Sequence, residues 1–223
     1  KKARVSWKKE DFSLTKEDWK NYHAKAQIAL RLDKHIDLDV DNYVVGRFIN
    51  HYLKSCGATY GRRNNPKSHY LWTGSCDFIQ YTLPDVFKSY FEKFHHGATL
   101  CELRHGKERY TIVPESPYDN TGEKVEWETY EEIYEYNGNI KIDVGKIALS
   151  TALTILYAGS GHRDVYCTAI AGTLIKNTDW SAEQIDDFVY NIAIEANDTE
   201  AEKRKQKGTT GKKAEKIYGI PKL

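Results

Sequence analysis

The sequence predicts an α+β fold in which a domain of mixed strands and helices is followed by a small bundle of helices. Two observations predict it. Up to residue 138, short runs that alternate apolar with polar residues, as half-buried strands do, lie between helical segments. After Asn137-Gly138-Asn139 these strand signals stop, and apolar residues recur at helical spacing. We therefore expect two domains, residues 1–138 and 139–223.

Helices are predicted at three places in the first domain. Thr15 followed by Asp18 is typical of a helix N-terminus. Residues 43–55 carry their apolar side chains on one helical face, and Pro84 precedes a third helix over residues 85–95. The alternating runs predict strands at residues 28–32, 36–40, 58–60, 69–72, 100–103, 110–113 and 124–127, with a polar loop between the third and fourth and a turn at residues 119–122 between the last two.

The second domain reads as helices throughout. Ser181 is a good N-cap, and Gln184 stands at the position that completes a capping box. The helices are predicted at residues 142–157, 165–176, 182–196 and 200–207.

Length, charge and cysteine content limit the class of protein. The 223 residues suffice for a real buried core, and 33 Lys+Arg against 32 Asp+Glu give a net charge of +1, which taken alone speaks against a nucleic-acid-binding protein. No apolar run approaches the roughly 20 residues of a membrane span, so we expect no membrane association. Four Cys without a CxxC pair indicate reduced thiols in a cytoplasmic protein.

A row of acids lies in the second predicted strand. Alternation places Asp37, Asp39 and Asp41 on one face, with about 6.6 Å between successive Cα atoms. Three like charges on one face are costly unless they face water or a cation, and Mg²⁺ takes carboxylate oxygens while keeping sites for substrate phosphates. The alternative is an exposed strand edge that the charges protect from pairing.

A basic, turn-rich stretch runs into the strand that starts with His69. Arg62, Arg63 and Lys67 are cations of the kind that bind phosphate, and Arg binds it bidentately. The alternative is a solvated hairpin loop.

A further acid, Glu102, lies in an otherwise apolar strand, and a buried Glu needs a partner or a metal. We expect Arg104 to point to the opposite face of this strand and therefore not to be that partner. Pro114 ends the next strand and leaves Ser116 in a loop from which it can approach a ligand.

Taken in order, the run "IDLDVDN…YGRRNNPKSHYLW…CELRHGKERYTIVPES…GEKVEW" resembles the primase-polymerase catalytic domain of the archaeo-eukaryotic primase superfamily, in the form carried by phages and plasmids. The resemblance covers residues 27–128, and its departures from the family pattern are Lys67 and Glu115. The matching positions are Asp37 and Asp39 in the first motif, Ser68 and His69 in the second, Glu102 in the third, and around them Gly61, Pro66, Leu103, Arg104, Gly106, Pro114, Ser116, Gly122, Glu123 and Trp127.

The second half has a looser resemblance. Gly161-His162-Arg163-Asp164, the helix after it and residues 180–185 are similar to the helical primase C-terminal module, although a generic helical bundle would also suit them. The basic stretch and the "GIPKL" ending resemble the junction before a hexameric superfamily 3 helicase. The resemblance thus implies a helicase domain in the same longer protein.

For the first domain the resemblance implies an RRM-like sheet, mixed or antiparallel, that carries a nucleotidyltransferase site. Asp37, Asp39 and Glu102 would be the catalytic residues and would hold two Mg²⁺ or Mn²⁺ ions. The reaction would be attack of a 3′-hydroxyl on the α-phosphate of an incoming NTP or dNTP, directed by a single-stranded DNA template, in primer synthesis and extension during phage or plasmid DNA replication. The setting would be the cytoplasm of a bacterial, archaeal or phage-infected cell.

Nucleotide binding would fall to residues near the second motif. His69 would contact the triphosphate, with Ser68 and the cations Arg62, Arg63 or Lys67, and Arg104 and Ser116 are further candidates for the nucleotide pocket. Asp41 either assists the other acids or lies at the exposed end of the strand.

The C-terminal segment is strongly basic. Residues 202–216 hold seven Lys/Arg against two Glu, so this segment can bind a phosphate backbone in a salt-dependent way. The alternative is a solvated linker. The candidate DNA-binding residues are Lys203, Arg204, Lys205, Lys207, Lys212 and Lys213.

Two other functions fit the same motifs. One is a noncatalytic DNA-binding module that docks a helicase. The other is a metal-dependent nuclease, since Asp/His/Glu clusters also serve phosphodiester hydrolysis.

Overall fold

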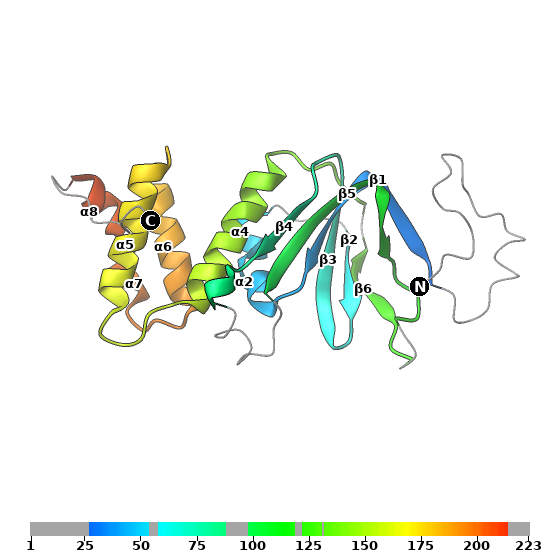
Figure 1. Cartoon of the computed structure of the whole chain (residues 1–223), viewed down its shortest axis with the longest axis horizontal. Helices are drawn as coiled ribbons and strands as arrows, with labels where there is room; N and C mark the ends of the chain where they lie inside the picture. The colour runs from blue at the N-terminus through cyan, green and yellow to red at the C-terminus, as the bar shows by residue number, and fades with distance from the viewer. Residues whose placement is uncertain (1–26, 54–57, 88–97, 119–121, 131, 214–223) are drawn as a thin grey trace, which may run out of the picture. The chain divides into compact units, whose positions relative to one another are not determined.

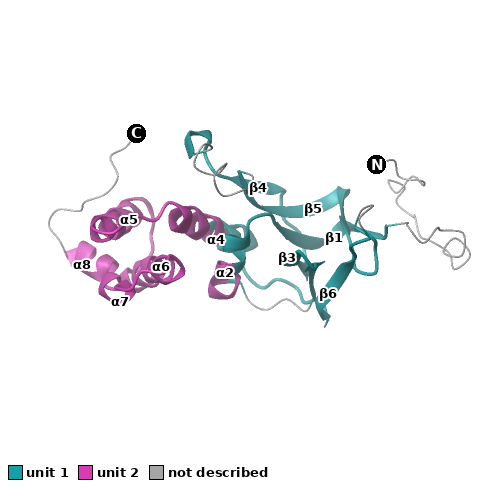
Figure 2. Cartoon of the chain, turned by 90° about the horizontal axis from the view of Figure 1, so that it is seen from below, with its two compact units in different colours: residues 1–46, 53–145 teal, residues 47–52, 146–223 magenta. Residues whose placement is uncertain are grey.

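The computed structural model describes residues 27–53, 58–87, 98–118, 122–130 and 132–213, and it confirms the α+β class (Figure 1). Two compact units are present, residues 1–46 with 53–145 and residues 47–52 with 146–223 (Figure 2). The first unit thus includes residues 139–145, which the sequence analysis placed in the second domain, and the second unit includes residues 47–52. Among the described residues, no helix has the length and apolar character that crossing a bilayer requires.

An antiparallel sheet of six strands forms the first unit. Its order is β4-β5-β1-β3-β2-β6, and α2 (Tyr43–Tyr52) follows β1 in the sequence and precedes β2. Because β3 lies between β1 and β2, these elements form a split βαβ arrangement. The strands are β1 (Ala29–Val40), β2 (Ala58–Arg62), β3 (Asn65–Thr73), β4 (Ile79–Thr82), β5 (Thr99–Ile112) and β6 (Val125–Tyr130).

Two pairs of predicted strands are single long strands. Residues 28–32 and 36–40 belong to β1, and residues 100–103 and 110–113 belong to β5. The two long strands pair with each other over most of their length, and irregularities between Arg31 and Asp37 absorb the polar residues that separated the predicted pieces. The short strand β4 was not predicted.

The predicted polar loop between residues 60 and 69 is wrong. β2 and β3 form a hairpin in which Arg62 pairs with Asn65, so only Arg63 and Asn64 form the turn. Gly61 permits this close pairing, because a Cβ added to it would lie 2.4 Å from the carbonyl oxygen of Asn65. Of the basic residues, Arg62 and Lys67 therefore stand on the paired strands, and Arg63 lies in the turn.

Alternation along β1 separates its two faces. Ile36, Leu38 and Val40 are buried on one face, whereas Asp37 and Asp39 point to the other. We call the face that carries Asp37 and Asp39 the acidic face. On it, β1 and the neighbouring strands contribute a buried hydrophobic cluster that consists of Leu32, Ala58, Tyr60, Leu71 and Val125. Asp37 consequently has no exposed surface.

Helices α5 (Arg163–Asn177) and α6 (Ala182–Glu195) build the core of the second unit. Ser181 and Gln184 form the predicted capping box at the start of α6. The core residues are Cys167, Ile170, Ala171, Leu174, Ile185, Phe188, Val189 and Ile192. Helix α4 (Ile140–Ile155) precedes these helices, and α7 (Ala201–Arg204) and α8 (Lys207–Lys213) follow them.

The predicted helix over residues 200–207 is divided at Lys205 and Gln206. The carboxylate of Asp186 accepts hydrogen bonds from the backbone N–H groups of Gly208 and Thr209, at 2.6 and 3.2 Å, and so caps the start of α8. Because of this long-range cap, a separate helix, α8, starts at Lys207, whereas the sequence pattern predicted one helix over residues 200–207.

Several predictions lie outside the described residues. These are the helix that begins near Thr15, the predicted helix over residues 85–95 beyond the 3₁₀ turn η1 (Asp85–Phe87), and most of the turn at residues 119–122.

Candidate functional site

One row of side chains crosses the acidic face of the sheet. Residues that stand directly opposite each other in antiparallel strands point to the same face, so the register defines the row. From β4 to β6 the row consists of Gln80, Glu102, Asp39, His69, Tyr60 and Trp127. The pairing thus brings all three sequence-predicted acids and the predicted histidine together on one face, because Asp37 is two residues from Asp39.

Arg104 bridges Asp37 and Asp39 of β1. Its Nη2 lies 2.5 Å from Oδ2 of Asp37, and its Nη1 lies 3.0 Å from Oδ2 of Asp39. The expectation that Arg104 points away from Glu102 is wrong, because residues two apart in a strand share a face. Arg104 is therefore the main counter-charge of the acidic pair.

His69 faces the remaining carboxylate oxygens. Its Nδ1 lies 3.3 Å from Oδ1 of Asp37 and 3.7 Å from Oδ1 of Asp39. Every oxygen of the two carboxylates consequently faces a basic group, either His69 or Arg104.

The charges of this cluster shift one another's pKa values. Burial alone would raise the pKa of Asp37, but the charges and hydrogen bonds of His69 and Arg104 hold it below its ordinary value. Burial would likewise lower the pKa of His69, but Asp37 and Asp39 raise it above its ordinary value. The cluster therefore favours an ionised Asp37 beside a protonated His69.

The pKa values of Asp39, in β1, and of Asp41, just after β1, shift in the opposite direction to that of Asp37. Burial raises the pKa of Asp39, even though His69 and Arg104 oppose this. Asp41 follows the last residue of β1 and is exposed, and partial desolvation with the negative charges of Asp39 and Glu102 raises its pKa to about 6. Asp41 thus lies at the exposed end of the strand, as one of the two alternatives had it.

Two residues that the sequence analysis did not select hold the basic groups in place. The hydroxyls of Tyr60 and Thr111 are hydrogen bonded at 2.7 Å in the interior, and Thr111 accepts a hydrogen bond from Nη2 of Arg104 at 3.3 Å. The Tyr60 ring is stacked on the imidazole of His69. Only the strand register, which places Tyr60 opposite His69, reveals this support.

Glu102 is half-buried, and its carboxylate accepts a hydrogen bond from the side chain of Gln80 at 2.9 Å. In the part of the chain that the structure describes, no three His, Cys, Asp or Glu side chains are arranged to hold a metal ion. Asp37, Asp39 and Glu102 offer oxygen ligands of the right type for Mg²⁺. As arranged, however, they do not fit a divalent cation, because Arg104 occupies the space between the two aspartates.

A pocket of about 350 Å³ opens beside the cluster. Asp39, Asp41 and the basic groups of His69 and Arg104 line one part of it, and Ser68 is buried in its wall. The other lining residues are Val40, Gly61, Arg62, Asn65, Tyr110, Thr111, Ile112, Tyr118 and Val125. The pocket therefore combines carboxylates, cations and aromatic rings.

Of the three predicted phosphate-binding cations of the hairpin, one lines the pocket and two do not. Arg62 lines the pocket, where its guanidinium lies 3.7 Å from the centre of the Tyr118 ring and 3.7 Å from a carboxylate oxygen of Glu123. Arg63 and Lys67 are exposed and are not among the lining residues. Arg62 is consequently the hairpin cation placed to meet a ligand in the pocket.

The prediction that Ser116 approaches a ligand is not supported by its position. Its side chain is completely buried, and its hydroxyl accepts a hydrogen bond from the backbone N–H of Ile28 at 2.8 Å and donates to the Ile28 carbonyl oxygen at 3.3 Å. Ser116 therefore ties the segment before β1 to the segment after β5.

The candidate DNA-binding residues of the second unit divide into two groups. Arg204 is buried, and its guanidinium contacts the carboxylates of Asp164, Asp198 and Glu200 at 2.9 to 3.2 Å. Its donors therefore serve the fold and do not face a phosphate backbone. The others keep partial or full exposure, with Lys203 near Glu200, Lys205 over the Tyr190 ring, Lys207 on Asp164, Lys212 on the Trp180 carbonyl and Lys213 exposed.

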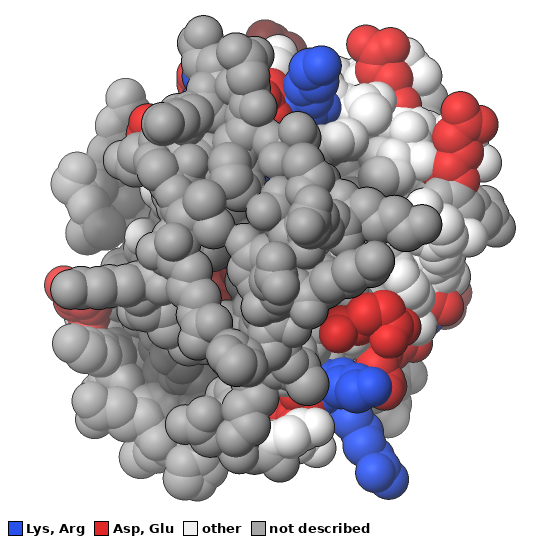
Figure 3. Space-filling view, turned by 90° about the vertical axis from the view of Figure 1, so that its right-hand side faces the viewer, with Lys and Arg blue, Asp and Glu red and all other residues white. Residues whose placement is uncertain are grey.

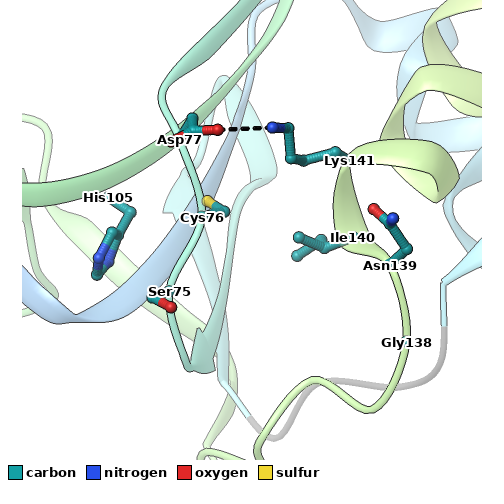
Figure 4. Close-up of a pocket in the computed structure, with 8 residues that line it drawn as sticks. All are labelled: Ser75, Cys76, Asp77, His105, Gly138, Asn139, Ile140 and Lys141. Carbon is teal, nitrogen blue, oxygen red and sulfur yellow. Dashed lines mark hydrogen bonds and ion pairs between the residues drawn. The ribbon is translucent and has the colours of Figure 1, made fainter.

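A second pocket of about 440 Å³ lies elsewhere on the first unit (Figure 4). In it, Nζ of Lys141 pairs with a carboxylate oxygen of Asp77 at 2.6 Å, near Cys76 and His105. None of the sequence-predicted site residues lines this pocket.

Exposed charges of both signs are mixed on the face shown in Figure 3, where the visible Lys/Arg and Asp/Glu side chains of the described residues form no single patch.

Comparison of the chain with protein-family models, with curated proteins and with solved structures found no match.

Proposed function

We propose that the first unit is a DNA primase-polymerase domain that catalyses template-directed nucleotidyl transfer. One observation carries the proposal. Asp37 and Asp39, His69, and Glu102 come from three separate segments of the family resemblance, and the register places all of them side by side on one face of three adjacent strands. Residues that are merely alike in sequence have no reason to converge in this way.

The strand order is compatible with the proposed RRM-like sheet. β5, β1, β3 and β2 are neighbours in that order, with α2 between β1 and β2 in the sequence, as in a split βαβ unit. The pocket on the face that carries Asp39, His69 and Arg104 is a suitable place for a nucleotide. Fold alone does not decide function, so the proposal depends on the site residues.

The pocket offers each part of a nucleoside triphosphate a suitable group. Arg62, His69 and Arg104 supply positive charge and N–H donors for phosphate oxygens. The rings of Tyr110 and Tyr118 supply flat apolar surface on which a base can stack. The proposed reaction joins a 3′-hydroxyl to the α-phosphate with loss of pyrophosphate, and the positioning of these groups would be the chain's main contribution to it.

A templated primer-synthesis assay tests the proposal. The full chain is incubated with single-stranded DNA and labelled ATP or dATP, with Mg²⁺ or Mn²⁺, and the products are separated by length. We expect incorporation by the wild type and none by Asp39→Ala. Asp33→Ala is the matched control, because Asp33 lies on the same strand but pairs with Arg31 outside the cluster.

Asp39 is a better position for the test than Asp37, because 21% of the Asp39 side chain is exposed whereas the Asp37 side chain is completely buried. Loss of Asp37 would leave Arg104 and His69 without a buried counter-charge and would disturb the fold as well as the activity. Normal incorporation by Asp39→Ala would exclude the proposed active site.

A noncatalytic DNA-binding module is the second candidate. The pairing of both aspartates with Arg104 and His69 favours it, since a site whose carboxylates are already neutralised is typical of a structural ion cluster. Two parallel measurements separate the functions. Binding of single-stranded DNA in a titration, without incorporation of labelled nucleotide, would indicate the noncatalytic module, and shortening of an end-labelled DNA strand would indicate a nuclease.

A further inference from the structure

We propose that the outer edge of β6 is a docking site for residues 1–9 of this chain, which bind there in extended form alongside residues 126–130. An added strand of this kind is held by main-chain hydrogen bonds and selected by its side chains. The inference goes beyond the proposed function and is independent of it, because none of residues 126–130 lines the pocket beside Arg104.

The edge of β6 that faces away from β2 is largely open. Among the described strands, β6 pairs with β2 alone. On the other side of β6, Val125 donates its N–H to the Ser116 carbonyl oxygen at 2.9 Å and accepts from the N–H of Glu115 at 3.0 Å. Beyond Val125, residues 126–130 carry N–H and C=O groups that no described residue pairs on this side. Such groups are a template for a further strand.

Two exposed aromatic side chains lie at this edge. Trp127 stands opposite Tyr60 and Tyr130 stands opposite Ala58, and both β2 residues belong to the buried cluster of the acidic face. The register shift between Thr59 and Tyr60 brings the two aromatic residues, three apart in the sequence, to that one face. Their ring centroids lie 4.6 Å apart, and 37% of Trp127 and 70% of Tyr130 is exposed. The pair is thus an apolar surface that a strand laid along the edge would cover.

Carboxylates accompany the aromatic pair along the edge. Glu126 directly precedes Trp127 and therefore points to the other side of the sheet, and Glu128, at the register shift, is exposed as well. The segment after β6 adds the exposed Glu132 and Glu135. A second copy of β6 would bring like charges together, and a phosphate backbone would be repelled. The edge thus suits a basic strand that has apolar side chains on one face.

The first nine residues of the sequence have these properties. They read KKARVSWKK, with five Lys/Arg and no Asp or Glu. Apolar residues alternate with Arg, Ser and Lys over residues 3–8, which is the pattern of a strand with two different faces. Ala3, Val5 and Trp7 would then lie toward the aromatic pair, and the basic side chains toward the glutamates. Residues 10–26, by contrast, include four Asp/Glu and suit this edge less.

The described part of the chain begins close to this edge. The side-chain amide of Gln27 donates to the carbonyl oxygens of Pro117 at 2.9 Å and of Tyr118 at 2.6 Å. Pro117 pairs in turn with Lys124, the residue directly before β6. Residues 10–26 can span up to about 55 Å, whereas β6 is about 20 Å long. This tether is therefore long enough, and it raises the local concentration of residues 1–9 at the edge.

Amide hydrogen exchange of the full chain is the first test. Arg4→Glu combined with Lys8→Glu should lower the protection factors of residues 126–130 about tenfold relative to the wild type, because the segment then repels the edge. Lys16→Glu combined with Lys20→Glu is the matched control, and β4, the strand at the other edge of the sheet, is the internal control. Equal protection of residues 126–130 in the wild type and the Arg4/Lys8 variant would overturn the inference.

Exchange of the charges between the two sides tests the pairing itself. Glu126→Lys combined with Glu128→Lys, both at exposed positions, should lower the same protection factors to a similar extent. Joining these two substitutions to Arg4→Glu and Lys8→Glu should restore the protection of the wild type. A fourfold variant no better protected than either double variant would contradict docking of residues 1–9. Protection that rises with protein concentration would assign the edge to a second copy and would overturn docking within the chain.

Discussion

The ring of Tyr60 lies on the imidazole of His69, with their centroids 4.7 Å apart and their planes 14° from parallel. Tyr60 is completely buried, and its hydroxyl reaches Thr111, which in turn contacts Arg104. One interior side chain thus supports both basic groups that neutralise the aspartates. The first two predictions concern this relationship.

Removal of the Tyr60 hydroxyl tests the buried hydrogen bond. Tyr60→Phe keeps the stacking on His69 but leaves the hydroxyl of Thr111 without this partner in the interior. We expect the free energy of unfolding to fall by about 1–3 kcal/mol. Urea denaturation measures it, with Tyr130→Phe as a control in which an exposed tyrosine should change stability by less than about 0.5 kcal/mol. Equal stability of both variants would contradict the inferred support.

The titration of His69 tests the charge state of the cluster. Asp37 and Asp39 raise its pKa above the ordinary 6.5. The stability that His69 contributes should therefore be fully present below pH 6.5 and be lost as the pH rises through its folded-state pKa. Nuclear magnetic resonance of the imidazole protons gives the midpoint directly.

The same effect should be visible in stability. The free energy of unfolding of the wild type relative to His69→Gln should decrease as the pH is raised across that midpoint. A midpoint at or below 6.5 would mean that burial outweighs the two carboxylates.

The hairpin that carries the basic residues depends on Gly61. A Cβ at this position would lie 2.4 Å from the Asn65 oxygen and 2.8 Å from the Lys67 nitrogen, and backbone atoms cannot give way easily. Gly61→Ala should lower the free energy of unfolding by about 1–3 kcal/mol. Gly46→Ala is the control, because nothing lies within 4 Å of its Cβ position in α2, and it should stabilise the helix by about 0.5–1 kcal/mol. Thermal or urea denaturation of both variants checks the difference in sign.

Substitution of Arg204 should affect the stability of the fold, whereas substitution of Lys213 should affect DNA binding alone. Arg204→Ala removes one of the two arginines that contact the buried Asp198 carboxylate, the other being Arg163 at 3.1 Å, and should cost on the order of 1–3 kcal/mol of stability. Lys213→Glu changes an exposed side chain, so it should leave stability nearly unchanged. If the basic segment binds single-stranded DNA, Lys213→Glu should weaken that binding and flatten its salt dependence.

Denaturation and a salt series of DNA-binding measurements separate the two roles. A salt dependence that Lys213→Glu does not alter would indicate a solvated segment. A fold that tolerates Arg204→Ala without loss of stability would contradict the buried ion cluster.

Local patterns were good predictors where neighbouring residues decide the outcome. The capping box of Ser181 and Gln184, and the shared face of Asp37 and Asp39, follow from spacing along one element. Element ends were less predictable. β1 and β5 continue through polar residues because each pairs with the other, and α8 starts where Asp186, 22 residues before Gly208 in the sequence, caps it.

The sequence by itself determined which acids share a strand face and which segments carry basic residues, because side-chain direction repeats every two residues in a strand. Only the tertiary structure decided what those acids touch. The register of β3 and β5 on β1 brings His69 and Arg104 to Asp37 and Asp39, and no pattern within one strand encodes the register of its neighbours. The same strand register makes Arg104 a partner of these acids, although Arg104 lies 65 or more residues after them in the chain.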